Sequence, residues 1–174
     1  MAIIFETKRL VLEAVKEQNI NIVIDIESHP DNCNYLWIGS YQEHLVEIND
    51  DKHILALFKE KETLDVVGYC LIRLDKKSNS FELRRIAITK KGIGYGKESM
   101  SGLLKYAFED LKVHRFWLDV YEDNIIGIKL YEKLGFHQDG ILRDSDYTNR
   151  GYMSQIIYSI LENEYQMMNK IEVE

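Results

Sequence analysis

A glycine-rich loop that follows an apolar segment and precedes an amphipathic helical pattern is the feature that most constrains the fold of this chain. Residues 81–88 have the composition of a β-strand, and residues 89–97 read Thr-Lys-Lys-Gly-Ile-Gly-Tyr-Gly-Lys. The N-terminus of a helix carries unpaired N–H groups that attract anions, and glycines let a phosphate approach the backbone closely. The segment therefore predicts a pyrophosphate-binding loop, with positive charge nearby from Lys90, Lys91 and Lys97.

Two better-known phosphate loops do not fit these residues. A P-loop needs glycine at the position of Lys91 and serine or threonine at the position of Glu98. The dinucleotide pattern G-x-G-x-x-G needs its last glycine at Lys97 or at Ser99, depending on where it starts. Neither the P-loop nor the dinucleotide pattern explains the segment.

The loop does match the pattern [Arg/Gln]-x-x-Gly-x-[Gly/Ala], with Lys91 in place of the first residue. Two further motifs follow in order: Trp-Leu-Asp-Val-Tyr-Glu-Asp-Asn at 117–124 and Lys-Leu-Tyr-Glu-Lys-Leu-Gly-Phe at 129–136. With these three motifs the chain resembles the GNAT superfamily of N-acetyltransferases, in its bacterial small-molecule or ribosomal-protein-type branch. The resemblance implies a mixed α/β fold, with a central antiparallel or mixed sheet flanked by helices.

The same resemblance implies acetyl-CoA as co-substrate, no metal, and a set of CoA-contacting residues. The backbone of residues 86–88 would pair with the pantetheine arm, and a backbone N–H there would polarise the thioester carbonyl. The residues implied to contact CoA are Ile86, Ala87, Ile88, Lys91, Gly92, Ile93, Gly94, Tyr95, Gly96, Lys97, Asn124, Gly127 and Lys133. For Asn124 a simple helix N-cap is the alternative interpretation.

Two residues are candidates for acid–base chemistry. Tyr131 lies seven residues after Asn124, two helical turns away on the same face, and by resemblance would protonate the departing CoA thiolate. The alternative for Tyr131 is a core aromatic residue near a helix end. By the same resemblance, Glu82 would be the base that deprotonates the acceptor amine. The alternative is an exposed strand residue paired with Arg84, and a water relay would then serve as base.

The charge distribution bears on the acceptor. The net charge of −7 argues against nucleic-acid binding, and residues 17–62 hold ten acidic residues against three lysines. Tyr35, Trp37 and Tyr41 lie among these acids, which would suit a polyamine or another cationic amine. The acids could equally be the solvated faces of surface helices, whereas Arg84 and Arg85 would suit an amino-acid or peptide acceptor.

The sequence therefore predicts an N-acetyltransferase that transfers the acetyl group directly to a primary amine in a ternary complex. Two alternatives stay open on sequence alone. One is a peptide or ribosomal-protein N-terminal acetyltransferase. The other is a non-catalytic acyl-CoA-binding module that lacks a productive acceptor site.

The 174 residues are expected to form a single cytoplasmic domain with a polar C-terminal tail at about 162–174, and to form a homodimer through an exposed strand. Strands are expected at 9–14, 53–58, 66–74, 81–88, 115–120, 136–142 and 152–161. Helices are expected at 17–28, 40–49, after the glycine loop, and at 124–134. Cys33 and Cys70 are expected to be buried free thiols.

Overall fold

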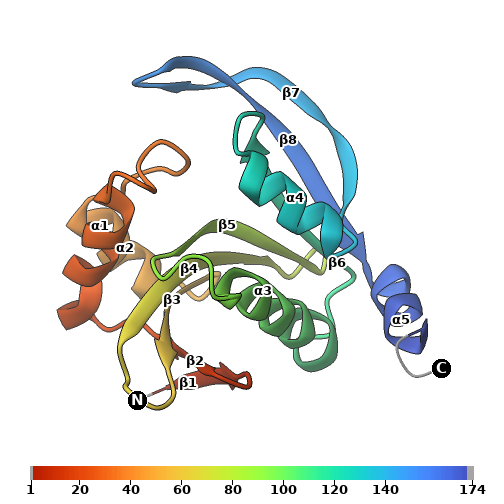
Figure 1. Ribbon diagram of the computed structural model, residues 1–174, viewed down its shortest axis with the longest axis horizontal. Helices are drawn as coiled ribbons and strands as arrows, with labels where there is room; N and C mark the ends of the chain where they lie inside the picture. The colour runs from red at the N-terminus through yellow and green to blue at the C-terminus, as the bar shows by residue number, and fades with distance from the viewer. Residues whose placement is uncertain (1, 172–174) are drawn as a thin grey trace. The chain divides into compact units, whose positions relative to one another are not determined.

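The computed structural model describes residues 2–171 of the chain. Eight strands and their flanking helices form a mixed α/β fold (Figure 1), as the sequence predicts. The described chain divides into two compact units. Within the described residues, the first unit comprises 2–74 and 83–103, and the second comprises 75–82 and 104–171.

The first unit is built on neighbouring strands in the order β1 to β5. These strands are β1 (Ile3–Glu6), β2 (Leu10–Ala14), β3 (His53–Glu60), β4 (Val66–Asp75) and β5 (Ser80–Ile88), the start of β5 belonging to the second unit. The pairs from β1 to β4 are antiparallel, with Leu12 opposite Phe58 and Ala56 opposite Cys70. Sequence analysis missed β1, a four-residue strand that pairs with β2 alone among the described residues.

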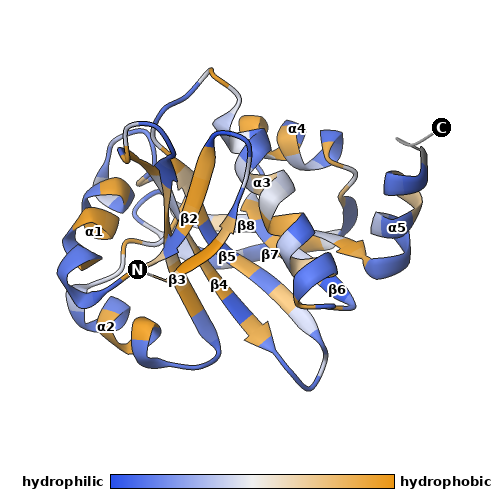
Figure 2. Ribbon diagram, turned by 90° about the horizontal axis from the view of Figure 1, so that it is seen from below, coloured by the Kyte–Doolittle hydropathy of each residue, from blue (hydrophilic) through white to orange (hydrophobic). Residues whose placement is uncertain are grey.

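Helices α1 (Ile20–Ser28) and α2 (Tyr41–Asn49) complete the core of this unit. The apolar face of α1, with Ile20 and Val23 fully buried, packs with Leu55, Tyr69 and Leu71 of the sheet. Figure 2 shows that apolar and polar residues alternate along both helices. Burial of one apolar stripe is the main source of stability for such short helices.

A capping box begins α2, where the sequence predicts the start of a helix. The Ser40 hydroxyl accepts a hydrogen bond from the N–H of Glu43, and the Glu43 carboxylate accepts one from the N–H of Ser40. The helix expected at 17–28 instead begins with a 3₁₀ turn, η1 (Glu17–Asn19), before α1.

Helix α3 (Tyr95–Lys105) follows the glycine loop and continues into a π-helical turn, η2 (Tyr106–Asp110). The apolar residues that predicted this helix are buried, except for half-buried Leu111. They are Met100, Leu103, Leu104, Ala107 and Phe108.

The second unit contains the order β6–β8–β7, in which both pairs are antiparallel. Its elements are β6 (Arg115–Tyr121), α4 (Ile125–Lys133), β7 (His137–Thr148), β8 (Gly151–Leu161) and α5 (Glu162–Ile171). Phe116 anchors the core of this unit by stacking on Phe81 at 4.5 Å and by an edge contact to Phe136 at 5.5 Å between ring centroids.

The β7–β8 hairpin is longer than predicted. Figure 1 shows it extending along and beyond α4. The first strand of the hairpin was predicted to end at residue 142 because residues 143–146 are all polar. The pairing continues to Thr148 opposite Gly151, after an irregularity between Leu142 and Asp146. A strand with both faces exposed needs no alternation of apolar and polar residues, so its sequence carries no period-two pattern that would predict a strand.

The polar tail expected from residue 162 on differs from the structure, where residues 162–171 form α5 and residues 172–174 lie outside the described part. The Tyr165 ring stacks on Phe108 at 4.8 Å, and its hydroxyl donates to Glu109 Oε1 at 2.8 Å. The thioether of Met168 lies against Gly135. Tyr165 and Met168 are three residues apart, on one face of α5, and both contact other parts of the second unit.

The described residues contain no helix of the length and apolar character needed to cross a membrane.

Candidate active site

The glycine loop between β5 and α3 is exposed and strongly curved. Gly92 and Gly94 have φ of 80° and 86°, in the left-handed region that glycine adopts without strain. The first hydrogen bond of the following helix runs from the N–H of Glu98 to the carbonyl of Gly94 at 3.1 Å. The N–H groups of Tyr95, Gly96 and Lys97 precede this first hydrogen bond, so they have no acceptor within the helix. This end of the helix is therefore suited to an anion.

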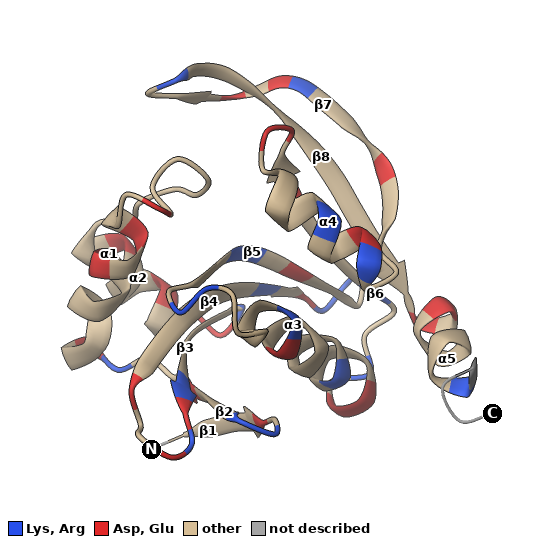
Figure 3. Ribbon diagram, in the orientation of Figure 1, with Lys and Arg blue, Asp and Glu red and all other residues tan. Residues whose placement is uncertain are grey.

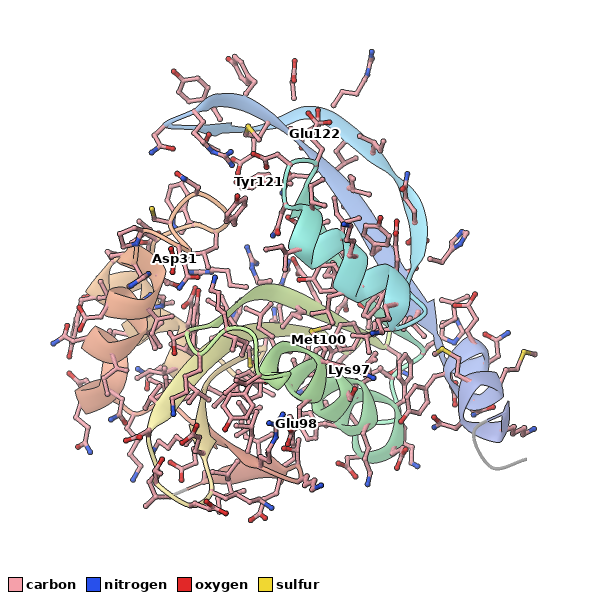
Figure 4. The ribbon with its side chains drawn as sticks, viewed as in Figure 1. Asp31, Lys97, Glu98, Met100, Tyr121 and Glu122 are labelled. Atoms are coloured by element: carbon pink, nitrogen blue, oxygen red, sulfur yellow. The ribbon has the colours of Figure 1, made fainter. Side chains whose placement is uncertain are left out.

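The turn between β1 and β2 holds this loop from one side. Figure 4 labels Glu98 in the first turn of α3; its carboxylate accepts hydrogen bonds from Thr7 Oγ1 at 2.7 Å and Arg9 Nε at 2.6 Å. Arg9 Nη1 also donates to the carbonyl of Ile93 at 3.0 Å. Sequence analysis did not single out Arg9, because nothing in its local pattern shows that it would meet a loop more than eighty residues away.

The lysines around the loop have different surroundings. Lys90 pairs with Glu60 at 2.7 Å, and the Tyr95 hydroxyl donates to the same carboxylate at 2.7 Å. These hydrogen bonds, led by Lys90, lower the pKa of Glu60 to about 2. Lys91 donates to Asn32 Oδ1 at 3.4 Å, and Lys97, labelled in Figure 4, is exposed on α3.

The strand that precedes the loop carries the predicted pantetheine-pairing residues in the first unit. Ala87 is buried, whereas Ile86 and Ile88 are half-buried. The carbonyl of Ala87 lies close to Gly68. A Cβ added at Gly68 would come within 2.4 Å of the Ala87 carbonyl oxygen. Glu82, the candidate base, is half-buried on the same strand in the second unit, and Arg84, two residues on, is exposed.

Helix α4 carries Asn124, Gly127, Tyr131 and Lys133 in the second unit. Asn124 is its N-cap, and its side-chain oxygen accepts from the N–H of Gly127 at 3.0 Å. A Cβ at Gly127 would lie 3.0 Å from the Asn124 amide, so this glycine fits the cap. The structure therefore places Asn124 at the N-cap of α4, with its side-chain oxygen as the capping acceptor.

Tyr131 is buried, with 7% of its surface exposed, and packs between Phe136 and Tyr158 at 5.7 and 6.3 Å between ring centroids. Burial, followed by the charge of Asp119, raises the pKa of Tyr131 to about 12. The phenol is therefore protonated throughout the physiological range. Lys133 is exposed in the last turn of α4, where a positive charge complements the helix dipole.

The segment before α4 is tied to the hairpin. The hydroxyl of Tyr121, labelled with Glu122 in Figure 4, bonds Asp146 of β7, and Arg150 pairs with Asp123. Burial and the hydrogen bond to Asp146 raise the pKa of Tyr121 above its usual value.

A buried ionic network lies in the first unit, and no pattern in the sequence predicts it. Arg85 pairs with Glu27 Oε1 at 2.9 Å and with Glu47 Oε1 at 2.6 Å. His44 bridges the other oxygens of the same two acids at 3.0 and 2.7 Å, and Tyr69 donates to Glu27 at 2.6 Å. Arg85 therefore holds carboxylates of its own chain, which corrects the suggestion that it binds an acceptor carboxylate.

The protonation of this network follows from its contacts. Burial alone would raise the pKa of Glu27, but hydrogen bonds from His44 and Tyr69 and the charge of Arg85 lower it. Burial alone would lower the pKa of His44, but hydrogen bonds to Glu27 and Glu47 raise it to about 9. Both groups are charged at neutral pH.

The network fixes the loop between α1 and α2. Glu27 accepts the N–H of Gly39 at 2.8 Å, and buried Asn32 donates to the carbonyl of Ile26 at 2.8 Å. Trp37 is 62% exposed on this loop. Figure 3 shows acidic residues on α1 and on the segment after it, where Figure 4 labels Asp31. Some of the predicted acidic surface is thus exposed, whereas Glu27 is a core residue.

The two cysteines differ in burial. Cys70 is buried, and burial raises the pKa of its thiol, whereas Cys33 is only partly buried, unlike the expectation. Within residues 2–171, no group of three or more His, Cys, Asp and Glu side chains could hold a metal ion.

Strands flanked by helices, with an exposed glycine loop at a helix N-terminus, define an α/β protein suited to a phosphorylated ligand. The family model described as Acetyltransferase (GNAT) family matches residues 12–136, so the chain belongs to that family. The predicted fold and reaction class are confirmed: the protein is an N-acetyltransferase, and this family uses acetyl-CoA.

Two relatives and one solved structure show how far the similarity extends. An uncharacterized N-acetyltransferase p20 of Bacillus licheniformis is 24% identical over 174 residues, covering 91% of this chain and 96% of that one. The spermidine N(1)-acetyltransferase of Vibrio cholerae is 22% identical, covering 90% and 95%. A crystal structure of spermidine N-acetyltransferase from Vibrio cholerae in complex with CoA and spermine has a TM-score of 0.80 at 21% identity, covering 91% and 98%.

Proposed function

We propose that this protein acetylates a primary amine of a cationic small molecule, with a polyamine as the best candidate, by direct transfer from acetyl-CoA. The glycine loop that opens α3 is the observation that carries CoA binding, since its curvature leaves backbone N–H groups for a pyrophosphate. In this proposal residues 91–97 hold the pyrophosphate. Ile86, Ala87 and Ile88 pair with the pantetheine arm, while Asn124, Gly127 and Lys133 contact CoA from α4.

The chemistry needs one proton removed and one supplied. An alkylamine with a pKa near ~10.4 must lose a proton before its nitrogen can attack the thioester carbonyl. We assign that step to Glu82 or to a water that it orients. As the C–N bond forms and the C–S bond breaks, Tyr131 donates its hydroxyl hydrogen to the sulfur.

The pKa of Tyr131 indicates how its hydroxyl acts in this step. A thiol has a pKa near ~8.5, so a phenol whose pKa is about 12 is the weaker acid. Tyr131 therefore acts first as a hydrogen-bond donor that stabilises negative charge as it develops on sulfur. When the proton passes to the sulfur, solvent supplies another to the Tyr131 oxygen in the same step, so that no free phenolate accumulates.

The acceptor assignment rests on the loop between α1 and α2. It presents exposed Trp37, Tyr35 and Asp31 on a backbone fixed by the buried network. Aromatic faces and carboxylates both attract an ammonium group. Relatives named as spermidine or spermine acetyltransferases support the same choice. A peptide or ribosomal-protein N-terminus is the second candidate acceptor, and the homodimer stays a prediction.

Thiol release from acetyl-CoA, measured with a panel of amines, tests the acceptor class. The panel contains spermidine, spermine, an aminoglycoside, free amino acids and short peptides with varied N-termini. We expect turnover with the polyamines, and a higher KM for spermidine in Asp31→Asn. Asp25→Asn, on the exposed side of α1, is the matched control and should leave that KM unchanged. Turnover with peptides alone would refute the polyamine proposal.

A further inference from the structure

Arg9 lies behind the glycine loop, in the turn that joins β1 to β2. Its guanidinium makes two separate contacts: Nε donates to Glu98 Oε2 at 2.6 Å and Nη1 donates to the carbonyl of Ile93 at 3.0 Å. Its carbon Cζ also lies over the Tyr95 ring, 4.5 Å from the centroid. One side chain therefore contacts the loop, the first residue of α3 and the first helical turn.

The contact to Ile93 sets the direction of one peptide group. In a trans peptide the carbonyl and the following N–H point in opposite directions. None of the described peptide bonds is cis. Since Arg9 holds the carbonyl of Ile93 toward itself, the N–H of Gly94 must point away from Arg9. Successive N–H groups turned to one side of a loop form a concavity that binds anions.

The contact to Glu98 removes an electrostatic conflict. A carboxylate in the first helical turn would repel a pyrophosphate bound at the same N-terminus. Glu98 accepts hydrogen bonds from the Arg9 side chain, the Arg9 backbone N–H and Thr7. Burial alone would raise the pKa of Glu98, but these hydrogen bonds lower it, so the carboxylate is charged and the Arg9 charge offsets it.

We infer that Arg9 is a positioning residue for acyl-CoA, which turns the Ile93–Gly94 peptide toward the pyrophosphate and neutralises Glu98. The inference rests on the proposed function, because it requires that the loop bind the pyrophosphate of CoA. It assigns Arg9 no contact with the reacting atoms. Lysine should replace it poorly, since a single ammonium cannot reproduce two donors held in a planar group.

The test compares two acetyl donors, acetyl-CoA and S-acetylpantetheine, which carries the same thioester without the pyrophosphate. With acetyl-CoA, we expect Arg9→Ala to raise KM about tenfold while kcat changes little, as expected for lost ground-state binding. With S-acetylpantetheine, wild type and Arg9→Ala should have the same kcat/KM. Arg9→Lys should recover only part of the loss.

Lys8→Ala is the matched control, because Lys8 is an exposed cation in the same turn and its removal changes the net charge equally. It should leave KM for acetyl-CoA unchanged. Equal losses with both donors would mean that Arg9 supports only the fold, and an unchanged KM in Arg9→Ala would refute the positioning role. Wild-type protein that neither binds CoA nor uses acetyl-CoA would instead refute the proposed function.

Discussion

At the scale of single residues, Tyr131 shows how burial prepares a side chain for the proposed reaction. Its ring is enclosed by Phe136 and Tyr158, and its pKa of about 12 keeps the hydroxyl protonated at any pH at which the protein works. Phenylalanine has the same ring without the hydroxyl, so a change at the oxygen atom can be tested apart from the packing of the ring.

Tyr131→Phe should keep the aromatic contacts and lower kcat by about 100-fold, the usual size of one acid–base contribution. CoA affinity, measured by calorimetry, should stay within about twofold, since the proposed role is confined to bond breaking. Tyr158→Phe is the control, because it removes a buried hydroxyl that bonds Glu132 in the same ring cluster. A Tyr131→Phe enzyme with normal turnover would show that another group serves the thiolate.

Residue roles differ in how well they can be read from sequence. The glycines of the loop and the cap at Asn124 are predictable because backbone geometry restricts which residues fit there. The burial of Glu27 is not, since its partners Arg85, Tyr69 and His44 come from three other elements. The acidic surface predicted from residues 17–62 includes Glu27 as an exposed charge, whereas Glu27 is a buried core residue in the structure.

At the scale of elements, helices and strands with strong apolar periodicity were predicted to within a few residues. The capping box at Ser40 located the start of α2, and the apolar spacing located α3. Strand β1, the far half of the β7–β8 hairpin and α5 were missed. None of the described residues in these three segments is buried, so tertiary contacts rather than apolar periodicity determine their structure.

The ionic network that joins α1 and α2 to β4 and β5 should make stability depend on pH. The pKa of His44 is about 9 in the folded protein and near ~6.5 when unfolded. A raised folded-state pKa gives stability that is complete below about pH 6.5 and is lost as pH rises through 9. The groups facing His44 are Glu27 and Glu47, both of which also bind Arg85.

Urea unfolding at intervals between pH 6 and 10 measures this dependence. The free energy of unfolding of wild type should fall by about 3 kcal/mol more than that of His44→Gln across this range. His29→Gln, which alters an exposed histidine of the same unit, should follow wild type. Parallel curves for wild type and His44→Gln would contradict the assignment of charge to this network.

At the scale of the whole molecule, membership of the GNAT family fixes the reaction class, and the acceptor and the order of events are the proposals. The family pattern was recognisable because its three motifs depend on local backbone geometry. The acceptor surface has no such pattern, since exposed aromatic and acidic residues suit many cations.

The central claim is direct transfer from acetyl-CoA to a cationic amine, and initial rates over a grid of acetyl-CoA and spermidine concentrations test it most directly. A ternary complex predicts thiol release that requires both substrates and double-reciprocal lines that intersect. Parallel lines would indicate a covalent acetyl-enzyme, and release that does not rise with spermidine would contradict the polyamine acceptor.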